Sequence, residues 1–264
     1  MKLKPLCAAR PNSGSGFTTA GKPAPKETSM NRMNRGADEL RPIRIETNYL
    51  KDVPGAVLVE HGDTRVLCAA TLESRVPFFL RDSGKGWIHA EYGMLPASVG
   101  SPRLNRERQR SHNRHIEIQR FIGRSLRCVF DLAAINGFTI HIDADVLQAD
   151  GGTRCAAVNG GFIALSHALR HLVFENMIRE LPPITPIAAV SVGILDGGVL
   201  VDLDQREDAA ADADINLVIS DSDEIVQLGV FAEEKRVSRT LFNQALDKGM
   251  AAGREILELL KTFL

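Results

Sequence analysis

The sequence predicts an α+β fold in which short strands and three long helices alternate along the chain. Apolar and polar residues alternate in short runs, and Gly, Asp, Asn and Ser separate these runs, as strands joined by turns require. Three longer stretches instead carry apolar residues at helical spacing. A content of 44% hydrophobic and 25% charged residues over 264 positions is that of an ordinary globular protein.

The first part of the chain differs from the rest. Residues 1–34 are rich in Pro, Gly, Ser, Thr and Lys and show almost no apolar periodicity. Such a segment buries too little apolar surface to fold, and no apolar stretch of signal-peptide length follows Lys2 and Lys4. We therefore expect a disordered extension, or a start codon assigned too early, and a single folded domain over residues 35–264.

The first half of that domain predicts a hairpin, a further strand and a helix. The stretch "GAVLVEHGDTRVLCAATLE" (55–73) predicts two strands around its "HGDT" turn. "GWIHAEYGMLP" (86–96) predicts one more strand. In "RHIEIQRFIGRSLRCVFDLAAI" (114–135) apolar residues recur at helical spacing, so we expect an amphipathic helix that ends near Asn136 and Gly137.

The second half repeats this order. Residues 138–150 alternate as a strand, and residues 151–175 predict a long helix that begins after two glycines. Residues 184–204 and 214–234 each predict two strands around an acidic turn, and residues 238–264 predict the last helix. Because both halves place hairpins before a helix, we expect an internal structural duplication.

Charge and cysteine content exclude several classes of protein. A formal net charge of -1 excludes a uniformly basic nucleic-acid coat but allows local basic patches. The sequence has no run of about 18 apolar residues, the length of a membrane span. Its four cysteines, Cys7, Cys68, Cys128 and Cys155, lack CxxC or zinc-ligand spacing. We expect reduced cysteines and a cytoplasmic protein.

The stretch "REDAAADADIN" (206–216) concentrates acidic residues between alanines. Asp212, Asp214 and Asn216 have period 2 and would share one face of a strand, while Glu207 and Asp208 lie in the connection before it. Carboxylates this close repel one another unless a cation compensates, and magnesium suits such ligands. A solvated acidic loop explains the same pattern.

Two further stretches predict anion binding. In "QADGGTR" (148–154) two glycines precede Thr153 and Arg154 at a helix start, where N–H groups and the helix dipole attract phosphate. The alternative is a plain turn with a helix cap. The polar stretch 101–120 contains only arginines as basic residues apart from histidine, which favours a polyanionic partner over a solvated loop. These are Arg103, Arg106, Arg108, Arg110, Arg114 and Arg120.

Together these stretches resemble the ribonuclease PH family, phosphate-dependent 3′-to-5′ exoribonucleases that trim transfer RNA ends. The similarity runs from about Arg35 to Leu260 and rests on "RGADELRPI", "SGKGWIHAEYGMLP", "IEIQRFIGRSLR", "DVLQADGGTRCAA" and "ED" followed by "DIN". The resemblance implies duplicated βαβα-type halves, as in the second domain of ribosomal protein S5. It also implies a homohexameric ring, a trimer of dimers, that acts on transfer RNA precursors and other RNA 3′ ends.

The resemblance also implies roles for single residues. Arg114, Gly152, Thr153 and Arg154 match the residues that bind the co-substrate, inorganic phosphate. The matches to the paired catalytic aspartates, expected to hold Mg²⁺ or Mn²⁺, are Asp208 and Asp214. The basic loop that grips transfer RNA is matched by Arg103, Arg106, Arg108 and Arg110. Departures from the family pattern occur at Gln205-Arg206, His112-Asn113 and His115.

Two other functions fit parts of the pattern. A non-catalytic RNA-binding ring subunit would share the architecture, but such subunits commonly lose the aspartate pair or the phosphate-binding arginines. A metal-dependent hydrolytic nuclease would use water and would need no anion loop. The expected activity is therefore phosphorolytic nucleotidyl transfer, which releases nucleoside diphosphates and runs in reverse as nucleotide addition.

Overall fold

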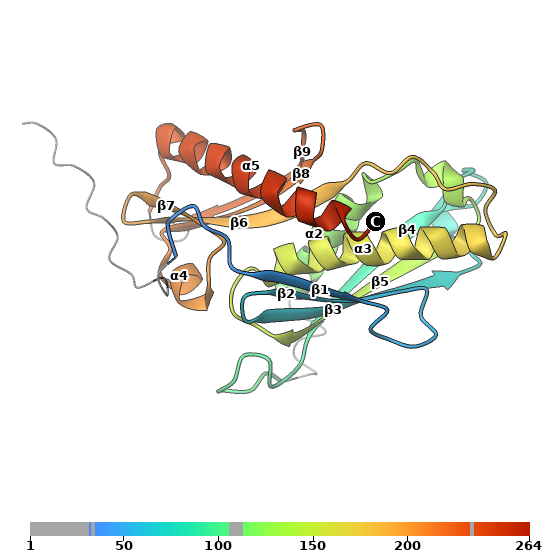
Figure 1. The fold of residues 1–264 in the computed structure, drawn as a ribbon, viewed down its shortest axis with the longest axis horizontal. Coiled ribbons are helices and arrows are strands. Elements are labelled where there is room, and N and C mark those ends of the chain that lie inside the picture. The colour runs from blue at the N-terminus through green and yellow to red at the C-terminus, as the bar shows by residue number, and fades with distance from the viewer. Residues whose placement is uncertain (1–31, 33–34, 106–112, 233–234) are drawn as a thin grey trace, which may run out of the picture.

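A computed structural model describes residues 32, 35–105, 113–232 and 235–264 and shows two sheets with helices packed between and over them (Figure 1). The first sheet has five strands in the order β1-β2-β3-β5-β4. All neighbouring strands are antiparallel except β4 and β5, which are parallel. The strands are β1 (Ile43–Thr47), β2 (Gly55–His61), β3 (Thr64–Glu73), β4 (Trp87–Met94) and β5 (Thr139–Gln148).

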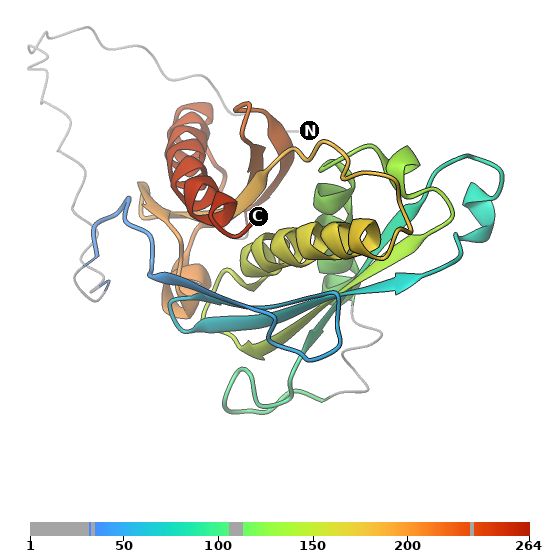
Figure 2. The ribbon, with the colours of Figure 1, turned by 45° about the vertical axis from the view of Figure 1, so that its right-hand side comes forward.

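Two helices, α2 (Asn113–Arg127) and α3 (Thr153–Phe174), cover one face of this sheet (Figure 2). The helix α3 lies so close to the strands that a Cβ on Gly160 would be 2.7 Å from the sulfur of Cys68. On its other side, Asn159 donates a hydrogen bond to the Ala189 carbonyl (2.9 Å) and accepts one from the Ala189 N–H (2.7 Å). Through Asn159, α3 is bonded to the second sheet.

The second sheet is antiparallel and has the order β7-β6-β8-β9. Leu217 and Ile219 on β8 face the last helix, whereas Asn216, just before them on the opposite face of the strand, contacts α3, so helices cover both faces of this sheet. One continuous apolar core therefore includes both sheets. The elements are β6 (Ile187–Leu195), β7 (Gly198–Val201), α4 (Gln205–Ala210), β8 (Ala213–Ser220), β9 (Ile225–Ala232) and α5 (Arg239–Lys261).

The predicted α+β fold and its hairpins are confirmed, but the helix predicted over 114–135 ends too late. The helix α2 ends at Arg127, and a separate 3-10 turn, η2, follows at Leu132–Ile135. The backbone N–H groups of Cys128 and Val129 bond three residues back, and the carbonyl of Val129 accepts from Thr185 N at 2.7 Å. This tertiary bond takes Val129 out of the helix.

Two other expectations concern the N-terminal residues 1–34 and the connection that follows residue 204. Residues 1–31, 33 and 34 of the expected N-terminal extension lie outside the described residues, while Arg32 is buried in the fold. The connection expected after residue 204 contains the short helix α4. None of the helices in the described parts of the chain has the length and apolar character of a membrane span.

Candidate active site

The turn between β5 and α3 contains two consecutive glycines with positive φ. Gly151 has a φ of 74° and Gly152 a φ of 65°. A Cβ on Gly151 would lie 2.4 Å from the carbonyl oxygen of Leu203, so no larger residue fits there without movement of the backbone. Gly152 is the N-cap of α3 and leaves the first N–H groups of the helix without a capping side chain. This is the end of a helix at which anions bind.

Tyr92 lies beside this helix start. Its hydroxyl shares a hydrogen bond of 2.9 Å with the hydroxyl of Thr153, and its ring meets the ring of His115 edge to face at 5.5 Å. Burial raises the pKa of Tyr92, while the bond to Thr153 and the positive charges of Arg114 and Arg154 oppose that rise. Both arginines that sequence analysis assigned to phosphate therefore act on the same phenol.

Arg154 is held between the two halves of the molecule. Its Nη1 atom donates to Oε1 of Glu117 at 3.2 Å, one turn along α2 from Arg114. Its guanidinium carbon lies 5.3 Å from the centre of the Phe231 ring on β9. Only 12% of the side chain is exposed, so its position is well defined by these contacts. The start of α2, the start of α3 and β9 meet at this residue.

Asp214 lies close to the same helix start. It is directly opposite Phe231 in the β8–β9 ladder, and its Oδ2 atom accepts from the amide of Asn216 at 2.9 Å. This bond confirms that the two residues share a face of the strand. Asn216 also accepts from the thiol of Cys155 at 3.4 Å. Burial raises the pKa of Cys155 to about 12, and the nearby charge of Asp214 adds to that rise, whereas Arg154 opposes it.

The other carboxylates of the acidic stretch have side-chain cations as partners. Glu207 is buried against Arg32, whose Nε atom lies 2.5 Å from Glu207 Oε1. Asp212 lies 2.8 Å from the ammonium of Lys235. The negative charges of Glu207 and Asp212 are therefore compensated by side chains of the protein itself. Asp208, exposed on α4, and Asp214 on β8 are the two carboxylates that the resemblance matches to the metal-binding pair.

Two family models match the chain. The model of the 3′ exoribonuclease family, domain 1, matches residues 39–170, and that of domain 2 matches residues 185–252.

The chain belongs to the 3′ exoribonuclease family. Domain 1 of the family corresponds to the first sheet with α2 and α3, and domain 2 corresponds to the second sheet with most of α5. The candidate site lies where these two domains meet, because Thr153 and Arg154 come from the first and Asp208 and Asp214 from the second.

Solved structures of Rrp46 and of exosomes have the same fold. Rrp46 from rice (Oryza sativa) has a TM-score of 0.70 and 20% identity, over 88% of this chain and 99% of that chain. A chain of the Archaeoglobus fulgidus exosome with RNA bound to the active site has a TM-score of 0.72 and 22% identity, over 86% and 91%. A chain of an archaeal exosome core has a TM-score of 0.70 and 21% identity, over 86% and 89%. These similarities establish the fold.

The arginine-rich segment is described only in part. Arg106, Arg108 and Arg110 lie outside the described residues, so their predicted contact with RNA stays a prediction. Arg103 is exposed in the loop before that gap, and Arg114 is exposed at the second position of α2.

The donor chemistry at Asp208 and Asp214 fits a magnesium ion. Within the described ranges, no group of three or more His, Cys, Asp or Glu side chains has metal-binding geometry. Magnesium is commonly held by one or two carboxylates, with water and phosphate oxygens completing its shell. Asp208 and Asp214 would supply such oxygens, and the bond from Asn216 orients the Asp214 carboxylate.

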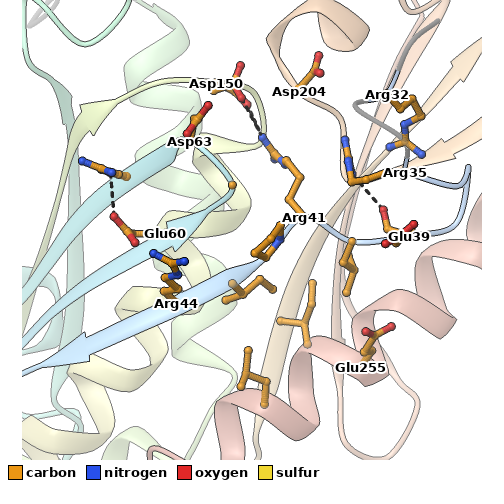
Figure 3. Close-up of a pocket in the computed structure, with 17 residues that line it drawn as sticks. Arg32, Arg35, Glu39, Arg41, Arg44, Glu60, Asp63, Asp150, Asp204 and Glu255 are labelled. Carbon is orange, nitrogen blue, oxygen red and sulfur yellow. Dashed lines mark hydrogen bonds and ion pairs between the residues drawn. The ribbon is translucent and has the colours of Figure 1, made fainter.

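Sequence analysis missed the buried ion pairs that support this site. The Nη2 atom of Arg41 lies 2.7 Å from Asp202 Oδ1, and its Nη1 atom donates to the carbonyl of Asp150. Arg41, Asp150 and Asp204 line a cavity of about 810 Å³ (Figure 3). Burial opposes ionisation of Asp202, but the hydrogen bonds and charge of Arg41 outweigh it, so the pKa of Asp202 is lowered. Arg41 belongs to the motif "RGADELRPI", one of the stretches that carry the family resemblance, and this was the sequence feature that could have indicated a role for it.

Proposed function

We propose that this protein is a phosphate-dependent 3′-to-5′ exoribonuclease that trims the 3′ ends of transfer RNA precursors. The observation that carries the proposal is the pairing of Arg154, at the glycine-capped start of α3, with Glu117, which lies one turn after Arg114 on α2. Two guanidinium groups beside such a helix start suit an inorganic phosphate ion. A hydrolytic nuclease would have no use for a second anion site.

In this proposal, residues at the starts of α2 and α3 hold the attacking phosphate. Arg114, Arg154 and the N–H groups after Gly152 bind its oxygens and reduce the repulsion between two anions that must approach each other. A phosphate oxygen forms a bond to the phosphorus of the terminal nucleotide. The bond from that phosphorus to the 3′ oxygen of the preceding nucleotide breaks, and the 3′ oxygen takes up a proton. A nucleoside diphosphate leaves.

Asp208 and Asp214 are the residues proposed to hold a divalent metal, magnesium or manganese. The metal would supply positive charge to the phosphoryl oxygens during transfer. Asn216 would keep the carboxylate of Asp214 oriented through the hydrogen bond of 2.9 Å.

We also infer that the chain works as a homohexameric ring. The strand β9 is the last strand of the second sheet and exposes a row of large apolar side chains. An exposed apolar edge strand is typical of a surface that a partner covers. These side chains are Ile225, Leu228, Val230 and Phe231. Light scattering coupled to size-exclusion chromatography would measure the number of subunits.

The test of the activity is release of mononucleotides from a 3′-extended transfer RNA with magnesium, in the presence and absence of inorganic phosphate. We expect nucleoside diphosphates, and only when phosphate is added. Nucleoside monophosphates without added phosphate would identify a hydrolase. Binding of the RNA without any product would identify a non-catalytic RNA-binding subunit.

A further inference from the structure

The proposed site is assembled from two segments that belong to different sheets. The loop Asp150–Arg154 joins β5 of the first sheet to α3 and includes Gly152, Thr153 and Arg154, three of the residues proposed to bind phosphate. The turn Asp202–Asp204 follows β7 of the second sheet and leads into α4, which carries Asp208. The position of a phosphate bound by the loop relative to Asp208 therefore depends on how firmly the loop and the turn are held together.

One buried side chain bonds to both segments. The guanidinium of Arg41 donates through Nε and Nη2 to the two carboxylate oxygens of Asp202, at 3.0 and 2.7 Å. The backbone N–H of Arg41 donates to the same carboxylate at 2.7 Å. On the other side, its Nη1 atom donates to the carbonyl of Asp150 and lies 3.7 Å from Asp150 Oδ2. The arginine thus joins the loop to the turn.

The loop and the turn also contact each other directly, and Arg41 lies against the loop. The N–H of Gln205, the first residue of α4, donates to Asp150 Oδ1 at 3.3 Å. A Cβ added to Gly152 would lie 3.1 Å from Nη2 of Arg41, so the guanidinium lies directly against the N-cap of α3. A shift of Arg41 would therefore change the position of the N-cap of α3.

We propose that Arg41 is a positioning residue of the phosphorolytic reaction, which sets the position of bound phosphate relative to the carboxylates on α4 and β8. This inference rests on the proposed function. We assign Arg41 a positioning role because its Nε, Nη1 and Nη2 atoms all donate to Asp150 or Asp202. Its planar fork bonds to both partners at once, which the single ammonium of a lysine cannot do in the same geometry.

The test compares Arg41→Lys with Arg44→Lys. Arg44 lines the same cavity, is exposed and lies on β1, so its replacement is a matched control (Figure 3). Steady-state phosphorolysis is measured at varied phosphate and at varied RNA, with circular dichroism and thermal unfolding on each protein. We expect Arg41→Lys to raise the KM for phosphate about tenfold and to leave the KM for RNA within about twofold. Arg44→Lys should match the wild type.

The two kinetic constants separate positioning from a purely structural role. Replacing a residue that only supports the fold lowers the fraction of enzyme that is folded and active. Such a replacement therefore reduces kcat and leaves the KM for phosphate unchanged. If Arg41→Lys does not fold, Asp150→Asn tests the same link from the other side. Asparagine keeps an acceptor for Gln205 but loses the ion pair with Arg41, and Asp150 is partly exposed. We expect a rise of about threefold in the KM for phosphate.

The inference is overturned if Arg41→Lys folds with a wild-type KM for phosphate, or if it fails to fold and Asp150→Asn leaves that KM unchanged. Failure of the proposed function gives a different result, because the wild-type protein itself would then form no nucleoside diphosphate from phosphate and RNA. Wild-type phosphorolysis beside an unaffected Arg41→Lys variant would reject the positioning role alone.

Discussion

His61, at the end of β2, is a buried imidazole whose titration should reduce stability in mild acid. Burial lowers its pKa to about 4 and the positive charge of Arg41 adds to this, although the negative charge of Asp202 opposes it. In the unfolded chain a histidine takes up a proton near pH 6.5. Between these two values the unfolded state binds more protons than the folded state, so the free energy of unfolding falls as the pH is lowered.

The size of this effect follows from the two pKa values. The difference between 6.5 and about 4 corresponds to about 3 kcal/mol when fully expressed. At pH 5 about 2 kcal/mol of this should be lost, because His61 is then almost fully protonated in the unfolded chain and mostly neutral in the folded one. Above about pH 7.5 the contribution should be constant, since neither state is protonated.

The assay is urea denaturation of the wild type and of His61→Asn at pH 7.5, 6 and 5. We expect the variant to be less stable at pH 7.5, and the gap between the two proteins to narrow by about 2 kcal/mol at pH 5. The series is repeated in 0.5 M KCl, which screens exposed charges but not a buried imidazole. A gap that stays constant from pH 7.5 to pH 5 would refute the reasoning.

Three further predictions follow from the site. Gly151→Ala should lower the free energy of unfolding by about 1–3 kcal/mol and weaken phosphate binding. Gly84 also has a positive φ but has open space around it, so Gly84→Ala should lower the stability without changing phosphate binding. Asp214→Asn should lower kcat at least about a hundredfold with RNA affinity nearly intact; loss of both together would mean that the carboxylate is structural. Replacing Arg106 and Arg110 by alanine should weaken transfer RNA binding and reduce its salt dependence by about one unit of log–log slope per lost phosphate contact. An unchanged slope would exclude these arginines from the RNA path.

Local patterns predicted the elements that position the candidate site. The two glycines before Thr153 predicted the start of α3, and the period-2 spacing of Asp214 and Asn216 predicted a shared strand face. These features depend on neighbours in sequence, for which turn chemistry and strand alternation are direct signals. The assigned roles of Asp208 and Asp214 in catalysis stay predictions.

Long-range partners could not be predicted in the same way. Arg41 and Asp202 are 161 positions apart, and Arg32 and Glu207 are 175 positions apart, so no local pattern connects them. Because its pairing with Arg32 is not visible in the sequence, Glu207 could not be distinguished from the candidate metal ligands Asp208 and Asp214. The end of α2 was missed for the same reason, because the bond that removes Val129 from the helix comes from Thr185.

The long separation of these ion pairs has a consequence for the order in which the protein matures. Arg32 and Arg41 leave the ribosome well before Asp202 and Glu207, so on a growing chain their bonds cannot form until most of the protein has been made. The first sheet with α2 and α3 can begin to assemble earlier, since the contacts of these elements with one another lie within residues 43–174. A newly made chain would therefore complete its candidate site late in folding, after its first domain is in place.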